Sequence, residues 1–121
     1  DYYASRGLGD VYKRQIYQTQ KYHSGVDIGA SYGATIVAAD GGTIITAGSV
    51  SGYGNCVVIN HGNGITTLYG HMSSIAVSSG QKVSKGQTIG YVGSTGNSTG
   101  PHLHWEVTVN GVRQNPLNYA S

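Results

Sequence analysis

The last long run of β-branched and aromatic residues reads Leu103-His-Trp-Glu-Val-Thr-Val-Asn110, directly after Gly100-Pro-His102. Because side chains alternate between the two faces of a strand, this run has one apolar and one polar face. The apolar face, which we expect in the core, comprises Leu103, Trp105, Val107 and Val109. The polar face comprises His102, His104, Glu106 and Thr108. The rise of a strand places the imidazoles of His102 and His104 about 6.5–7 Å apart, so this face can carry a functional site.

Five further segments have the same β-branched character and are separated by Gly-rich turns. They are residues 35–38, 43–47, 56–60, 65–71 and 88–92. Asn63-Gly64 and Asn110-Gly111 suit tight hairpins, because both residue types tolerate positive φ. No segment shows a helical period over three turns. We therefore expect an all-β fold, mainly antiparallel β-sheet or sandwich with little helix, in a single compact domain with a groove over the sheet.

The composition excludes several classes of protein. Gly supplies 20 of the 121 residues and only 10% are charged, which excludes a coiled coil and disfavours a charged disordered tail. The net charge of +2 is spread along the chain, so we expect no nucleic-acid partner. No apolar run reaches the ~20 residues of a transmembrane helix. Cys56 is the only cysteine, and its apolar surroundings in the sequence are typical of a buried strand.

The first twenty residues differ from the rest of the chain. They hold five of the twelve charged residues and show no sustained alternation. We interpret residues 1–20 as an irregular leader that could be non-native, and residues 21–121 as the folded domain.

The histidines suggest a metal site. His23 and Asp27 stand four residues apart, with Gly25 allowing a bend between them, and His102 and His104 share a strand face. Zn²⁺ favours nitrogen and oxygen ligands of this kind, and catalytic zinc sites use three protein ligands plus water. The spacing of His23 and Asp27 alone is a weak signal and that of His102 and His104 a moderate one, but together in a small sheet domain they favour zinc.

A second strand adds another candidate. Alternation in residues 65–71 predicts that Thr67, Tyr69 and His71 share a polar face. Glu106 is the only glutamate and does not stand between two histidines, so the chain lacks the HExxH pattern, and no GxSxG occurs. A hydrolase of this sequence would need a metal to activate water and a histidine outside the ligand set to move protons.

These motifs resemble those of the M23 (LytM/lysostaphin-type) zinc metallopeptidases. The resemblance rests on His23-Ser-Gly-Val-Asp27, Tyr69-Gly-His71 and Gly93-Ser-Thr-Gly-Asn-Ser-Thr-Gly-Pro-His-Leu-His-Trp-Glu106, and it runs from about Tyr22 to Tyr119. It implies that one Zn²⁺ per domain is bound by His23, Asp27 and His104. It also implies that the catalytic residues are His71 and His102, either of which could be the base.

The resemblance further implies a substrate and a location. The family generally cleaves peptide bonds in peptidoglycan, in cross-bridges or at cross-links, and the last motif looks closer to that of the cross-link-cleaving members. We therefore expect peptidoglycan peptides as partners and an extracytoplasmic location (secreted, cell wall or periplasmic). We expect a monomer because the chain is a small sheet domain. Some members carry a tyrosine that helps to stabilise the oxyanion, and Tyr17 stands six residues before His23. Asn97 and Ser98, in the loop ahead of His102, are further candidate substrate contacts.

Several interpretations stay open. Glu106 could orient His104, or it could be a solvated or hydrogen-bonded end of the strand. His61 is expected to be structural or on the surface, and Trp105 to pack in the core. The chain could also be a catalytically silent member of the family that binds cell wall or a partner protein. Residues 80–90 resemble the lysine turn of biotinyl or lipoyl carriers, but Lys82 and Lys85 lack the carrier context.

Overall fold

The computed structural model describes residues 20–21, 26–96 and 100–114, and these residues contain strands and no helix. No helix able to cross a membrane therefore occurs within these three ranges. The prediction of an all-β fold is confirmed. The strands are β1 (Gln20–Lys21), β2 (Val26–Gly29), β3 (Thr35–Val37), β4 (Gly42–Val50), β5 (Gly54–Gly62), β6 (Ile65–Ile75), β7 (Lys82–Val83), β8 (Thr88–Val92), β9 (His102–Val109) and β10 (Val112–Gln114).

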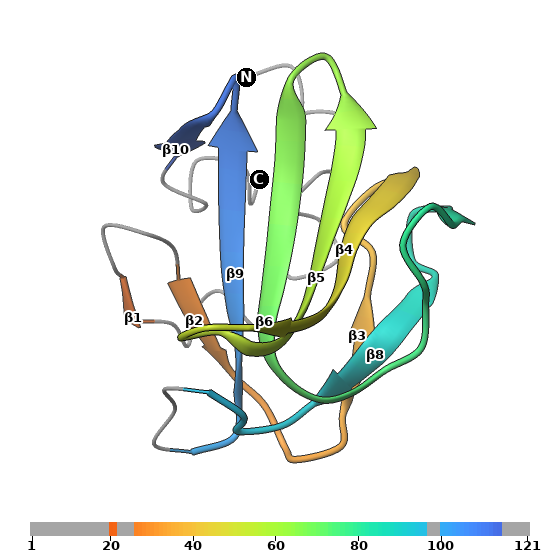
Figure 1. The fold of residues 1–121 in the computed structure, drawn as a ribbon. Coiled ribbons are helices and arrows are strands. Elements are labelled where there is room, and N and C mark those ends of the chain that lie inside the picture. Colours follow the sequence, from red (N-terminus) through yellow and green to blue (C-terminus); the bar gives the residue numbers. More distant parts are fainter. Residues whose placement is uncertain (1–19, 22–25, 97–99, 115–121) are drawn as a thin grey trace.

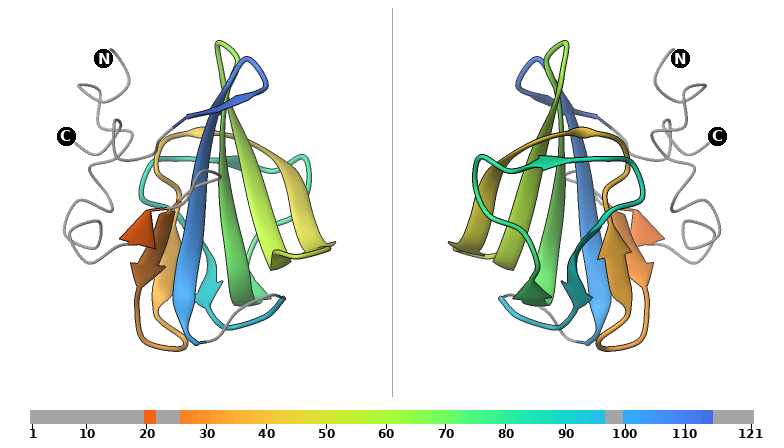
Figure 2. Two further views of the ribbon diagram at one scale, coloured as in Figure 1. Left: turned by 90° about the vertical axis from the view of Figure 1, so that its left-hand side faces the viewer. Right: turned by 90° about the vertical axis from the view of Figure 1, so that its right-hand side faces the viewer.

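The strands form one antiparallel sheet in which the long strands lie at the centre. Its main path runs β1-β2-β9-β6-β5-β4-β7, while β10 pairs with β9 and the β3–β8 pair is joined to β6 through β8. Figure 1 shows β9, β6, β5 and β4 side by side, and Figure 2 shows how these four strands twist relative to one another. Strand β9, which carries two histidines, therefore lies between β2 and β6.

The two predicted hairpin turns are confirmed. Asn63 and Gly64 connect β5 to β6 with φ of 53° and 79°, and Asn110 and Gly111 connect β9 to β10 with φ of 52° and 81°. Positive φ at both central residues is the signature of the type I′ hairpin, which matches the twist of the strands. The amide of Asn110 also donates a hydrogen bond of 2.7 Å to the carbonyl of Gly64, so the two hairpin turns are hydrogen-bonded to each other.

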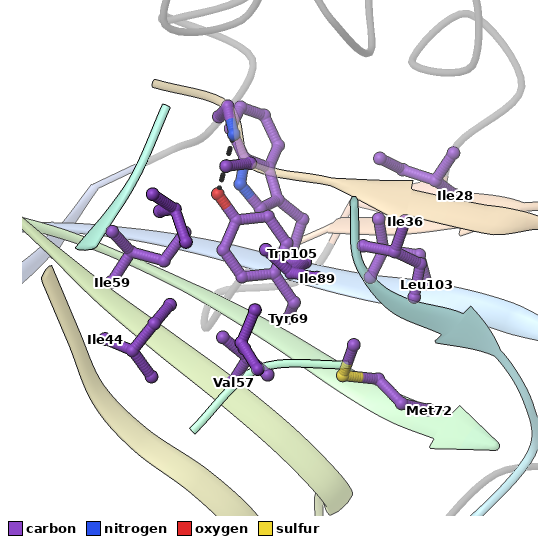
Figure 3. Close-up of a cluster of buried hydrophobic side chains, with 14 of the residues drawn as sticks. Ile28, Ile36, Ile44, Val57, Ile59, Tyr69, Met72, Ile89, Leu103 and Trp105 are labelled. Carbon is purple, nitrogen blue, oxygen red and sulfur yellow. Dashed lines mark hydrogen bonds between the residues drawn. The ribbon is translucent and has the colours of Figure 1, made fainter. Parts of the chain in front are cut away.

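The core lies on the face of β9 that alternation predicted. Leu103, Trp105 and Val107 are buried, and they pack with Tyr69 of β6 and with residues of β3, β4, β5 and β8 (Figure 3). Burying each such side chain contributes about 1.5–3 kcal/mol, so this face fixes the register of β9. Cys56 is also fully buried, as expected.

The predicted polar face of β6 is wrong for two of its three residues. Tyr69 lies directly opposite Trp105 in the sheet, and both Tyr69 and Thr67 are fully buried on the core side. His71 nevertheless lies among the histidines of the opposite face, because its φ of 60° interrupts the alternation of β6. The register between β6 and β5 shifts here by one residue, since Tyr69 pairs with Val57 and Met72 with Asn55, and alternation counted from the sequence does not include such a bulge.

Candidate functional site

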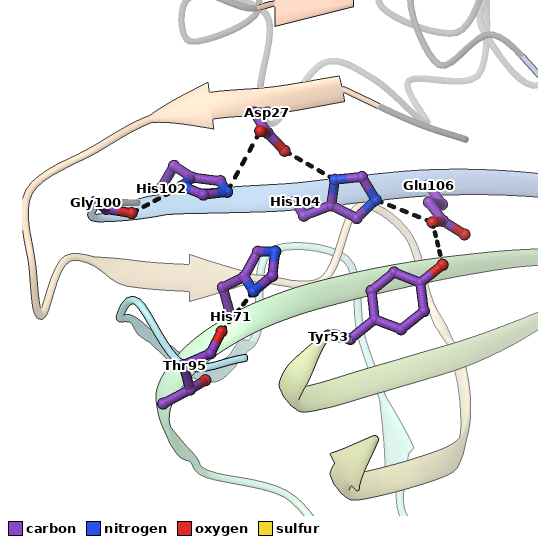
Figure 4. A network of polar contacts seen from close by, with 8 residues as sticks. All are labelled: Asp27, Tyr53, His71, Thr95, Gly100, His102, His104 and Glu106. Atoms are coloured by element: carbon purple, nitrogen blue, oxygen red, sulfur yellow. Dashed lines mark hydrogen bonds and ion pairs between the residues drawn. The ribbon is translucent and has the colours of Figure 1, made fainter. Parts of the chain in front are cut away.

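Three strands place the polar residues of the site on one face of the sheet. Asp27 of β2 is paired with His104 of β9, and His102 stands two residues before His104 on the same strand. One oxygen of Asp27, Oδ1, lies 2.8 Å from His104 Nδ1, and the other, Oδ2, lies 3.4 Å from His102 Nε2. A single carboxylate therefore contacts both imidazoles of β9 (Figure 4).

His71 enters the site from β6. Its ring centroid lies 4.8 Å from that of His102 and 5.9 Å from that of His104. Its Nδ1 atom lies 2.5 Å from the carbonyl oxygen of Thr95, which can only accept, so Nδ1 carries the hydrogen. The other ring nitrogen faces His102 and His104 in Figure 4. The neutral form of His71 thus presents a lone pair to the centre of the site.

Burial also affects the protonation of His71. Its side chain is almost fully buried, and this burial lowers the pKa of His71 below its ordinary value near 6.5. The hydrogen bond with Thr95 opposes the shift, while the nearby charges of His102 and His104 reinforce it. The net direction favours the uncharged imidazole, which is the form able to accept a proton.

His102 is oriented by the chain just ahead of it. Its Nδ1 atom lies 2.8 Å from the carbonyl oxygen of Gly100, which again can only accept a hydrogen bond. The Nε2 atom of His102 is therefore the atom that it presents to Asp27 and to the site. His71 and His102 are held in the same way, each by a backbone carbonyl on Nδ1.

A buried carboxylate lies behind His104. Oε2 of Glu106 lies 2.9 Å from His104 Nε2 and accepts a hydrogen bond of 2.6 Å from the hydroxyl of Tyr53. Arg113 of β10 approaches the other oxygen, with Nε 3.5 Å from Oε1. Glu106 is only 3% exposed, so the interpretation of a solvated strand end is wrong and that of a hydrogen-bonded residue oriented toward His104 agrees with the contacts.

Burial and hydrogen bonds in this network shift three pKa values. Burial alone would raise the pKa of Glu106, but hydrogen bonds from His104 and Tyr53 outweigh it and the net shift is downward. Burial would likewise lower the pKa of His104, but its bonds to Glu106 and Asp27 raise it. Burial, helped by the bond to Glu106, raises the pKa of Tyr53 to about 12. Tyr53 therefore stays a neutral hydrogen-bond donor and Glu106 an ionised acceptor.

The structure brings together four of the residues that the sequence singled out, and leaves four untested. Asp27, His71, His102 and His104 converge as described above. The other candidates lie outside the described residues, and they are Tyr17, His23, Asn97 and Ser98. In the part of the chain that the structure describes, no group of three or more His, Cys, Asp or Glu side chains is arranged to hold a metal ion.

Sequence reasoning missed Tyr53 and Arg113. Tyr53 lies in the turn between β4 and β5, and Arg113 lies on β10 opposite Thr108 of β9. Neither belongs to a motif, and only the pairing of strands brings them to Glu106. His61 lies away from the site, where it is part of a buried hydrogen-bond chain, so its structural interpretation agrees with the structure.

The chain matches one protein family over most of its length. The family model described as Peptidase family M23 covers residues 21–116. DD-carboxypeptidase/endopeptidase Mpg of Neisseria meningitidis serogroup B is 46% identical over 105 residues, which are 87% of this chain and 24% of that protein. Peptidoglycan DD-endopeptidase ShyA of Vibrio cholerae serotype O1 is 45% identical over 95 residues, 78% of this chain and 22% of that protein.

A third relative is named as an activator. Murein hydrolase activator NlpD of Salmonella dublin is 39% identical over 98 residues, which are 80% of this chain and 26% of that protein. The chain thus spans about a quarter of the length of each of these three relatives.

Two solved structures share the fold. The catalytic domain of lysostaphin from Staphylococcus simulans gives a TM-score of 0.79 at 30% identity, over 89% of this chain and 96% of that chain. A zinc-containing peptidase from Vibrio cholerae gives a TM-score of 0.73 at 38% identity, over 76% of this chain and 28% of that chain.

Proposed function

The chain belongs to peptidase family M23, and we propose that it is a zinc-dependent endopeptidase that hydrolyses peptide bonds in bacterial peptidoglycan. The observation that carries the proposal is the convergence of Asp27, His71, His102 and His104 from three strands on one face of the sheet. Relatives named as DD-endopeptidases support the reaction, and ShyA, which is named as a peptidoglycan DD-endopeptidase, supports the substrate class.

We assign the zinc ligands to His23, Asp27 and His104, of which the structure describes the last two. Their donor atoms fit Zn²⁺, because a carboxylate oxygen of Asp27 and a ring nitrogen of His104 face one another at 2.8 Å and both are of the type that zinc prefers. When bound, Zn²⁺ would polarise the scissile carbonyl and lower the pKa of the attacking water. The zinc-containing relative of known structure supports this choice of metal.

His71 and His102 are proposed to move the protons. Each has its Nδ1 hydrogen held by a backbone carbonyl, so each offers Nε2 to a substrate. The pair can provide an acceptor for the proton of the attacking water and a donor to the leaving amine. Their ring centroids are 4.8 Å apart, so one bound peptide could contact both.

Further assignments rest on the sequence alone. We propose Tyr17, Asn97 and Ser98 as substrate contacts, a groove over the sheet as the place where the peptide binds, and one zinc ion per domain. We further propose that residues 21–121 are the peptidase domain, residues 1–20 a leader, the protein a monomer and its location extracytoplasmic. The location is supported by the relatives that are named as a peptidoglycan endopeptidase and as a murein hydrolase activator.

A catalytically silent module that binds cell wall or a partner protein is the second candidate. The relative named as a murein hydrolase activator favours it, since a protein with that name need not cleave the wall itself. The residues at the matched positions favour catalysis instead, because loss of a ligand or of a catalytic histidine is the simplest route to a silent member. In this chain all five positions are filled.

Mass spectrometry of fragments released from purified peptidoglycan separates the two functions. The full chain is incubated with a wall that has glycine bridges and with a wall that has direct cross-links, each with and without a chelator. We expect release of peptides that the chelator abolishes, and the fragment masses identify the bond. Absence of release by protein that carries one zinc ion would favour the silent module.

A further inference from the structure

We propose that Glu106 is a positioning residue for His104: its carboxylate, held by Tyr53 and Arg113, accepts the Nε2 hydrogen of His104, so that Nδ1 can offer its lone pair to the metal. This inference rests on the proposed zinc site. It concerns the contact of Glu106 with His104 behind that site, together with Tyr53 and Arg113, which no sequence motif connected to it.

The first step is the geometry of His104, whose two ring nitrogens contact different carboxylates. Nδ1 lies 2.8 Å from Asp27 Oδ1 on the side of the site, and Nε2 lies 2.9 Å from Glu106 Oε2 on the far side (Figure 4). A neutral imidazole has one hydrogen and one lone pair. For Nδ1 to offer its lone pair, the hydrogen must lie on Nε2, and Glu106 is the group that accepts it there.

The second step is that Glu106 is itself fixed. Its side chain is buried, and burying a carboxylate without hydrogen bonds is costly. The hydroxyl of Tyr53 donates to Oε2 at 2.6 Å, and Nε of Arg113 lies 3.5 Å from Oε1. A nitrogen of Arg113 also donates to the Tyr53 hydroxyl at 3.3 Å. The carboxylate is thus held by side chains from a turn and from β10, and neither partner lies on β9.

Tyr53 additionally limits the movement of the imidazole. Its ring centroid lies 5.6 Å from that of His104, with the planes inclined by 33°. Gly70 of β6 lies opposite His104 in the sheet, and a side chain there would contact both Tyr53 and His104. A methyl group there would sit at ordinary van der Waals distance from both residues. Glu106 therefore offers the acceptor for the Nε2 hydrogen of His104, and the ring of Tyr53 limits the position of the imidazole.

The third step is the consequence for the metal. An anionic acceptor on the far nitrogen of a metal-bound histidine orients the ring and strengthens its donation, and removal of such an acceptor typically weakens metal binding by about 10- to 100-fold. A glutamine at position 106 has the same shape but no charge. If the carbonyl of the glutamine faces His104, its NH₂ group faces the guanidinium of Arg113, and both of these groups are donors. If the side-chain amide is reversed, its NH₂ group faces Nε2 of His104 and favours the tautomer with the hydrogen on Nδ1.

The test is the zinc affinity of the full chain, measured by competition with a chromophoric chelator. We expect Glu106→Gln to weaken zinc binding by about 10- to 100-fold. Tyr53→Phe keeps the carboxylate and removes one hydrogen bond to it, so about a 3- to 10-fold loss is expected. Thr108→Val, on the same face of β9 but without a place in this network, serves as the matched control and should bind zinc as the wild type does.

A second measurement separates positioning from stability. Thermal unfolding of the metal-free proteins reports the fold, and a purely structural Glu106 would lower the unfolding temperature while leaving the zinc affinity of the folded protein unchanged. That result in Glu106→Gln overturns the inference and leaves the proposed zinc peptidase intact. If Glu106→Gln does not fold, Tyr53→Phe decides, and wild-type zinc affinity in it overturns the inference. Absence of zinc binding by the wild-type chain overturns both proposals.

Discussion

His71 and Thr95 are joined by a hydrogen bond of 2.5 Å from the Nδ1 atom of the imidazole to the Thr95 carbonyl oxygen. The backbone of His71 is left-handed, with φ of 60°, and its amide donates to the carbonyl of Tyr53 at 2.7 Å. Residues other than glycine rarely adopt this conformation, and where they do, the surroundings compensate for the strain. Two loops therefore hold His71, one at its backbone and one at its ring.

The first prediction concerns the role of His71 in proton transfer. We expect His71→Ala to retain its zinc and to lose turnover by about 10²- to 10⁴-fold, the usual contribution of a general acid–base group. Zinc content by elemental analysis and the rate of peptide release from peptidoglycan measure the two effects separately. A rate near that of the wild type would remove His71 from the mechanism. His61→Gln, away from the site, is the control and should keep both zinc and rate.

The second prediction concerns the contact between the loops that hold His71. Gly54 has φ of 67°, and a methyl group on it would overlap both the carbonyl carbon and the hydroxyl of Thr95. Gly52, in the same turn, has φ of 85° but no atom within 4 Å of an added methyl group. We expect Gly52→Ala to lower the free energy of unfolding by roughly 1–2 kcal/mol, the cost of a left-handed alanine.

Gly54→Ala is expected to lose roughly 1–3 kcal/mol more than Gly52→Ala, because overpacking adds to the backbone cost. It should also lower turnover, because Thr95 would shift together with the ring of His71. Denaturant unfolding and peptide release on the two variants measure this difference. Equal stability and equal turnover of the two variants would show that the contact between Gly54 and Thr95 does not position His71.

Much of the sheet could be predicted because its rules are local. The alternation in β9 predicted its core face, and Asn63-Gly64 and Asn110-Gly111 predicted both hairpins, because each signal depends on neighbouring residues. The arrangement of the site residues depends instead on which strands pair with one another. The four-residue strand β2 was not predicted, and its pairing with β9 is what places Asp27 opposite His104. Tyr53 and Arg113 lie 53 and 7 residues from Glu106 in the chain, so no motif could connect them.

His71 lies beside His102 and His104 although the face predicted for it on β6 is wrong. The sequence predicted that Thr67, Tyr69 and His71 share a polar face, whereas Thr67 and Tyr69 point into the core. The positive φ of His71 interrupts the alternation at a residue that we propose to be catalytic. Histidine gives no signal for this conformation, because the contacts with Tyr53 and Thr95 that stabilise it form only in the folded sheet.

The third prediction concerns the metal ligands. His104→Ala should abolish both tight zinc binding and activity, because it removes one of the three proposed ligands. Elemental analysis after dialysis against a weak chelator measures the zinc, and peptide release measures the activity. Zinc retained at full stoichiometry in this variant would contradict the assignment of His104 as a ligand. Retention by His71→Ala under the same dialysis is the matched comparison, since both variants remove a histidine of the same site.

A hydrogen-bond chain in the core leads to the last prediction. His61 Nδ1 lies 2.7 Å from the carbonyl of Gly41, which can only accept, so this nitrogen carries the hydrogen. Nε2 then accepts from the hydroxyl of Thr67 at 2.7 Å. Thr67 in turn accepts from the hydroxyl of Tyr69, and Tyr69 accepts from the amide of Ala39. With His61 neutral, every hydrogen in the chain therefore has a single consistent direction.

Protonation of His61 should therefore destabilise the fold. Burial lowers the pKa of folded His61 below 6.5, its ordinary value, although the bond to Gly41 and the charge of Asp40 oppose the shift. As the pH falls below 6.5, the unfolded chain takes up a proton at His61 while the folded chain does not, so the free energy of unfolding decreases. The decrease is complete once the pH passes below the lowered pKa of the folded protein.

The comparison with His61→Gln isolates this effect, because the variant keeps every other titrating group. We expect the wild type to lose more stability than the variant between about pH 7.5 and about pH 5, in urea unfolding of both proteins with a chelator present. The chelator matters because zinc would add its own pH dependence through the site histidines. Equal losses in the two proteins would mean that folded His61 takes up its proton as readily as the unfolded chain. The hydrogen-bond chain from His61 to Ala39 would then not require the neutral imidazole.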